Sequence, residues 1–246
     1  MSGERMRKIF SVFFAPLLAL TFINRPVNAN VLDRDTSDPL YMLKIEDVLS
    51  QTSLTYWDNV LRLGQTFSYG LNNRLTISAN VHYQQDFDGP EDGFSSIDLG
   101  GIYRVGMADG NSAHLISDVL FGLKFGGSSR VRTPYFADST YYAGYRFGRQ
   151  WAGLTLAATI KSSWIFDEVR GMAYIDFVPE AYFRINQDWR LGTSFTLRKA
   201  TNPHYNQEWL GGKIVRQYGR TQYIGHLDYE FESNELQVGA KVNILF

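Results

Sequence analysis

Hydrophobic and polar side chains alternate along most of this chain. From about Glu46 onward, apolar or aromatic residues recur at every second position, and no stretch shows the 3.6-residue period of a helix convincingly. Leu75 and Ile77 fall on one face of such a segment, and Thr76 and Ser78 fall on the other. The pattern predicts an all-β fold.

Short connections rich in Asn, Asp and Gly divide the pattern into about twelve strands, within a range of 10–14. An even number of antiparallel strands brings the C-terminus back to the end where the first strand starts. Five short turns then share that end, and the three longest loops share the other, as in bacterial outer-membrane barrels. The five turns are Asn72-Asn73, Ala108–Asn111, Gly148–Gln150, Asn186–Asp188 and Tyr218–Arg220. The remaining connections are 58–59, 88–93, 126–138, 167–171, 199–206 and 232–234.

One proline does not fit this division. Pro179 falls inside an expected strand, where it cannot donate a ladder hydrogen bond, and a closed barrel has no edge strand to accommodate it. We expect a β-bulge there or a misplaced strand boundary.

The N-terminus has the features of an export signal. Arg5, Arg7 and Lys8 precede the apolar stretch Ile9–Ile23, and small residues lead up to an expected cleavage after Ala29. The apolar stretch is too short for a spanning helix, which needs about 20 residues. The sequence therefore predicts a signal peptide over 1–29, a periplasmic leader over 30–45 and a barrel over 46–246.

Alternation alone does not say which face of the strands points inward. A soluble β-sandwich or barrel would place the apolar face inside, whereas a membrane barrel places it outside. Export, strands long enough to span a bilayer, Trp and Tyr near strand ends and a terminal Phe246 favour the membrane. We therefore expect a closed antiparallel transmembrane β-barrel in the outer membrane of a Gram-negative bacterium. Its expected partners are outer-membrane lipid, lipopolysaccharide and, through Phe246, the barrel-assembly machinery.

Two segments resemble a known family. The first is the hairpin 69–75, which reads Tyr-Gly-Leu-Asn-Asn-Arg-Leu, and the second is the strand 93–104, which ends in Gly-Gly-Ile-Tyr-Arg. Both are similar to segments of the outer-membrane proteins named for the meta-pathway of phenol degradation. The strand departs from that pattern at Ser95-Ser96. The resemblance implies an outer-membrane transporter or channel without catalytic residues. It also implies small solutes, among them hydrophobic or aromatic ones.

Composition and charge remove several other classes of protein. The chain of 246 residues has no cysteine, which excludes disulfides, thiolate metal sites and a lipidated cysteine. Its formal net charge of -1 argues against a nucleic-acid partner. No histidine has a second ligand at metal-binding spacing, and no phosphate-binding loop precedes a helix. We therefore expect no catalytic, cofactor-binding or metal-binding residues.

A barrel enzyme is the least favoured alternative. Outer-membrane phospholipase carries a serine two residues after its histidine, and that spacing does not occur at any of the four histidines here. The residues two positions after His82, His114, His204 and His226 are Gln84, Ile116, Asn206 and Asp228.

The polar face supplies the candidate functional residues. In a barrel it lines the lumen, where opposite charges on neighbouring strands either brace the wall or select solutes by charge. Both interpretations are open from the sequence. The candidate lumen-lining residues are Asp98, Arg104, Asp118, Lys124, Arg146, Lys161, Asp176, Glu180, Arg184, Arg190, Arg198, His226, Asp228, Glu230 and Lys241.

The longest loop is a candidate constriction. Twelve strands leave a lumen narrow enough for one segment to block, and the loop 126–138 contains Arg130, Arg132, Tyr135 and Phe136. An ordinary exposed loop is the competing interpretation. The expected function is passive passage of small solutes through the outer membrane, and the alternative is a non-conducting structural or surface-interaction barrel.

Overall fold

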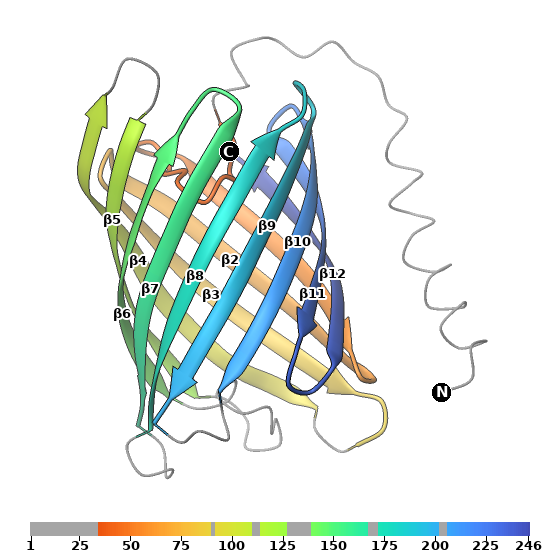
Figure 1. Ribbon diagram of the computed structural model, residues 1–246. Coiled ribbons are helices and arrows are strands. Elements are labelled where there is room, and N and C mark those ends of the chain that lie inside the picture. The colour runs from red at the N-terminus through yellow and green to blue at the C-terminus, as the bar shows by residue number, and fades with distance from the viewer. Residues whose placement is uncertain (1–33, 90–91, 110–113, 127–138, 167–171, 202–205) are drawn as a thin grey trace. The chain divides into compact units, whose positions relative to one another are not determined.

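Twelve antiparallel strands form one closed barrel (Figure 1). The structure, a computed structural model, describes residues 34–89, 92–109, 114–126, 139–166, 172–201 and 206–246. The strands are β1 (Val48–Trp57), β2 (Val60–Asn72), β3 (Leu75–Asp86), β4 (Gly93–Asp109), β5 (His114–Gly126), β6 (Thr140–Gln150), β7 (Leu154–Ile165), β8 (Ala173–Arg184), β9 (Trp189–Ala200), β10 (Gln207–Tyr218), β11 (Thr221–Glu230) and β12 (Glu235–Leu245). The predicted fold class and strand number are confirmed. Within the described ranges, no helix has the length and apolar character needed to cross a membrane.

The barrel closes because its last strand pairs with its first. β1 pairs with both β2 and β12, in registers such as Ser53 with Gly64 and Ser53 with Lys241. We call the end where β1 begins and β12 ends the terminal end, and the opposite end the loop end. Four of the five predicted short turns connect strands at the terminal end through described residues, whereas the fifth includes residues 110–113, outside the described ranges.

The tightest hairpin shows how sequence sets the register. Trp57 pairs with Val60 across a two-residue loop, and both loop residues have positive φ, 35° at Asp58 and 63° at Asn59. Two successive positive φ values define the turn whose twist matches that of the paired strands, and Asp and Asn adopt them more readily than most residues.

Pro179 causes no bulge, so the expectation of one at this position is wrong. It lies within β8 and pairs with Ala158 of β7. On the β9 side, pairing passes from Phe177–Leu197 to Glu180–Ser194, so the ladder omits Val178 and Pro179 without changing register. The missing donor is therefore accommodated by a local gap in one ladder. The bulges lie instead near Gly70, His82 and Arg104.

The two faces of the strands are inverted relative to a soluble protein. Outward-facing Leu99 and Phe121 are 47% and 43% exposed, whereas Asp118 and Arg190 on the inner face are fully buried. Among described residues, large apolar side chains cover the outside, and the inside holds mostly polar and charged groups. The polar face of the strands therefore points into the barrel.

Aromatic side chains gather on the outer face near the loop end. The Tyr141 ring stacks on Trp164 with centroids 4.6 Å apart, and Tyr83 meets Phe94 edge to face at 5.5 Å. Such positions are typical of the aromatic belts of membrane barrels. Trp57 is an exception to the expected distribution: it is buried on the inner face, with the Arg62 guanidinium 4.4 Å from its ring.

Candidate functional site

All fifteen predicted lumen-lining residues occupy the inward positions of their strands. They share the alternate positions of the buried polar side chains, although Arg184, the last residue of β8, is exposed at the terminal end. The predicted constriction residues Arg130, Arg132, Tyr135 and Phe136 and the expected signal peptide 1–29 lie outside the described residues.

One carboxylate in the wall is held by two arginines. Asp118 on β5 accepts hydrogen bonds from Arg104 Nε on β4 at 2.8 Å and from Arg146 Nη2 on β6 at 2.5 Å. Asp118 is fully buried, so these bonds replace the water that its charge has lost. Three neighbouring strands are thereby joined by a cluster with an excess of one positive charge.

A second cluster repeats the arrangement nearer the loop end. Asp176 on β8 contacts Arg198 Nε at 2.6 Å and Lys161 Nζ at 3.5 Å. The Arg198 guanidinium also lies 4.2 Å from the ring of Tyr174. Both clusters match the bracing interpretation, and both leave the wall more positive than negative.

The other candidate residues either form contacts within the wall or face the lumen. Asp228 contacts His226 at 3.0 Å, and Glu230 accepts a backbone hydrogen bond from Glu232 at 3.2 Å, which fixes the loop after β11. Lys241 and Glu180 face the lumen among other charged groups.

Residues 34–47, which we call the plug segment, lie inside the lumen at the terminal end. Their side chains and backbone contact inward residues from β2 around to β12. Figure 1 shows the segment in red-orange within the ring of strands, near the labelled C-terminus. The interpretation of 30–45 as a leader did not anticipate these contacts. One feature of the sequence could have indicated them: the segment is rich in acidic residues, whereas the predicted lumen has more basic than acidic residues.

The first anchor of the plug segment is the Asp35 carboxylate. It accepts hydrogen bonds from Arg190 Nε at 2.8 Å, from the Tyr182 hydroxyl at 2.9 Å and from Gln222 Nε2 at 2.7 Å. All four side chains are buried. Ser37 strengthens the anchor, because its carbonyl oxygen accepts a hydrogen bond from Lys213 Nζ at 2.9 Å.

The second anchor lies on the neighbouring strands β6 and β7. Asp38 accepts hydrogen bonds from Gln150 Nε2 at 3.0 Å and from Thr155 Oγ1 at 2.6 Å. Leu40 follows, with its side chain packed among buried residues of β5 and β7 and its carbonyl oxygen bound by Arg104 Nη2 at 2.7 Å. The segment is therefore fixed by hydrogen bonds to strands from β12 and β11 around to β4.

The C-terminal half of the plug segment is tied to itself and to β2. Arg34 Nη1 lies 3.1 Å from Asp47 Oδ1, which joins the two ends of the segment. Tyr41 is partly buried beside this pair, and burial, followed by the nearby Asp47 charge, raises the pKa of Tyr41 to about 12. Tyr41 therefore stays neutral across the physiological pH range.

A space of about 290 Å³ remains between the plug segment and the wall. Its lining comes from β1, β2, β3, β4, β6, β10, β11 and β12, with contributions from the plug segment itself. The charged side chains and the histidine along it are Asp38, Arg146, Lys213, His226 and Lys241. Basic groups therefore predominate beside the plug segment.

Gly70 is where the plug segment lies closest to the wall. A Cβ atom at Gly70 would sit 1.9 Å from the carbonyl oxygen of Lys44, so no side chain fits while the segment is docked. We expect Gly70→Val to displace the exposed Lys44 region and to speed trypsin cleavage after Lys44 several-fold. Gly212→Val is the matched control, because a Cβ there would meet nothing nearer than 4.0 Å. Equal cleavage of both variants would contradict the docked position of the segment.

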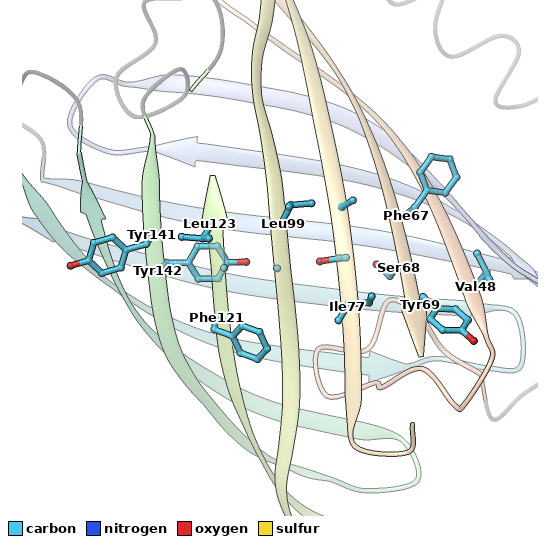
Figure 2. Close-up of a pocket in the computed structure, with 14 residues that line it drawn as sticks. Val48, Phe67, Ser68, Tyr69, Ile77, Leu99, Phe121, Leu123, Tyr141 and Tyr142 are labelled. Carbon is cyan, nitrogen blue, oxygen red and sulfur yellow. The ribbon is translucent and has the colours of Figure 1, made fainter. Parts of the chain in front are cut away.

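Another hollow lies on the outer face. An apolar groove of about 720 Å³ crosses β2 to β6, and Figure 2 shows Phe67, Leu99 and Leu123 among its side chains. Inside the wall behind it, the Tyr142 ring lies over Gly122, where a Cβ would come within 2.4 Å of that ring. The hollow is thus separated from the lumen by backbone and by Tyr142.

The described residues give little evidence for a catalytic site. Among them, no group of three or more His, Asp or Glu side chains could hold a metal ion. His226 and Asp228 are paired, and Ser194 lies across Gly211 from Asp228. A serine hydrolase needs the histidine next to the serine, but here the aspartate stands between them in the strand register.

No protein-family model matches this chain, and no curated protein is similar to it in sequence. The resemblance to the phenol-degradation family therefore stays a prediction.

Structure comparison gives clear matches. The KdgM porin superposes with a TM-score of 0.59 at 12% identity, over 80% of this chain and 98% of that one. The NanC porin gives 0.58 at 9% identity, over 80% and 98%. An outer membrane channel from Pseudomonas putida F1 gives 0.59 at 8% identity, over 85% and 98%. The fold is that of outer-membrane porins. At these identities the likeness establishes the architecture of the barrel and leaves function to be argued from the lumen.

Proposed function

We propose that this protein is a channel of the bacterial outer membrane through which small solutes pass passively. The observation that carries the proposal is the inverted burial of a closed barrel: Asp118 and Arg190 are buried inside, while Leu99 and Phe121 are exposed outside. Such a surface is unfavourable in water and suited to lipid, and such a wall serves polar solutes.

The direction of the barrel follows from its connections. In bacterial outer-membrane barrels, short turns face the periplasm and long loops face outward. The terminal end, with its short turns and the plug segment, is then periplasmic. The apolar outside contacts lipid and lipopolysaccharide. The exposed Phe246 is available to the barrel-assembly machinery.

The solute class follows from the space beside the plug segment. Lys213, Lys241 and Arg146 line it, and Asp38 is the acidic residue among its lining. A narrow passage with this excess of positive charge favours anions. The hydrophobic or aromatic solutes implied by the family resemblance gain no support from this lining, so we favour small polar or anionic solutes.

A non-conducting barrel is the second candidate. The plug segment favours it, because the segment is held inside the lumen by the wall contacts of Asp35 and Asp38. The two candidates differ in whether ions cross the folded protein.

Single-channel recording in a planar bilayer tests the proposal. We expect discrete conductance steps and, under a KCl gradient, a reversal potential that shows preference for chloride. Lys241→Glu is expected to move that potential toward cation preference, because Lys241 lines the residual space.

The matched control is Lys199→Glu. This substitution makes the same change of charge at an outward, exposed position of β9, so the preference for chloride should stay unchanged. A protein that inserts and resists unfolding in detergent but does not conduct would contradict the channel proposal and favour the structural barrel.

A further inference from the structure

Three wall side chains surround one carboxylate in a manner that suits a binding site. Arg190 on β9, Tyr182 on β8 and Gln222 on β11 all donate to Asp35, at 2.7 to 2.9 Å. They come from three different strands and are all buried. A buried guanidinium with two neutral donors beside it provides the charge-assisted hydrogen bonds that bind a carboxylate.

The wall holds these donors in place without help from Asp35. Arg190 Nη1 donates to the carbonyl oxygen of Gln187 at 2.9 Å, and Arg190 Nη2 donates to Gln217 Oε1 at 3.2 Å. Gln217 Oε1 also accepts from Gln222 Nε2 at 3.3 Å, while Tyr182 packs with two buried apolar neighbours, Val215 and Ile224. Since these partners of Arg190 are neutral, its positive charge is balanced by Asp35.

We propose that Arg190, Tyr182 and Gln222 form a carboxylate-binding site, that Asp35 of the plug segment is its resident occupant, and that small free carboxylates compete for it. Removing the Asp35 side chain leaves a buried guanidinium with two oriented donors and space for one carboxylate group. A solute carboxylate that reaches the site loosens the plug segment, and this consequence rests on the proposed channel function.

Chemical rescue of the full-length protein tests the site itself. The chain has no cysteine, so Leu40→Cys provides a single thiol at a position that is 1% exposed while the plug segment is docked. In this background, Asp35→Ala removes one partner of a buried charge pair and should speed maleimide labelling by roughly 30-fold. Formate or acetate should restore most of the protection, whereas formamide and chloride should not.

Two matched variants define the mechanism. Asp38→Ala removes a plug carboxylate bound only by neutral wall groups, so formate should rescue it far less. Asp35→Asn keeps the site filled with a neutral amide, so it should undock the segment less than Asp35→Ala and gain no protection from formate. Arg190→Met added to Asp35→Ala should abolish the rescue.

The possible outcomes separate this inference from the channel. If Asp35→Ala folds, as shown by its mobility shift on unheated gels, and formate gives no more protection than chloride, the site is overturned. Equal rescue of Asp35→Ala and Asp38→Ala would also overturn it. If Asp35→Ala fails to fold, maleimide labelling of the parent Leu40→Cys protein tests the site instead. Formate must then speed that labelling more than chloride does, or the site is overturned. Selective rescue in a protein that never conducts would uphold the site and reject the channel.

Discussion

Replacing Asp118 by leucine will lower the free energy of unfolding by about 3–5 kcal/mol, because removing one member of a buried charge cluster leaves the others unpaired. Arg104 and Arg146 both donate to this carboxylate, which is fully buried. Without it, two guanidinium groups on the strands that flank β5 would be left unpaired in a poorly solvated wall. Reversible urea unfolding in lipid vesicles measures the change.

Two comparisons make this result specific. Asp228→Leu removes a carboxylate that is one-third exposed and contacts one histidine, so its effect should be below about 1 kcal/mol. Adding Arg104→Met and Arg146→Met to Asp118→Leu should recover much of the loss, since an apolar cluster of similar volume avoids the unpaired charges. A triple variant less stable than Asp118→Leu would show that the arginines stabilise the barrel independently of the carboxylate.

Replacing Leu99 by arginine will destabilise the folded barrel in lipid by about 2–4 kcal/mol, the cost of a basic side chain on the lipid face near the midplane. Leu99 lies near the middle of β4, faces outward and is 47% exposed (Figure 2). In a water-soluble barrel the same substitution would cost little, because the side chain would extend into solvent. Unfolding in vesicles therefore reads out the environment of this face.

Leu115→Arg is the matched control on the neighbouring strand β5 and the same face. Leu115 is 58% exposed and lies close to the terminal end of β5, where a basic side chain reaches the interface and costs about 0–1 kcal/mol. A small effect at both positions would contradict a membrane environment around this face. An equally large effect at both would mean that the hydrocarbon region extends to the terminal end.

The alternation of side chains predicted the fold class and, together with the turn residues, the strand number. Export, strand length and the aromatic residues then indicated which face points inward. Each strand has a period of two, so residues such as Asp98, Asp118 and Asp176 were assigned to one face from sequence alone, and the structure places them there. The two-residue turn Asp58-Asn59 was likewise readable, because few residue pairs adopt two positive φ values. These features depend on near neighbours in the chain.

Only the tertiary structure decided which charges pair and what fills the lumen. Asp35 and Arg190 are 155 residues apart, and their ion pair depends on barrel closure and on the path of the plug segment, neither of which has a local periodic signal. Pro179 is similar: its strand tolerates the missing donor because the register on both sides of the gap is held by the neighbouring pairs. Local rules determine the direction of each side chain, and closure of the barrel determines which side chains meet.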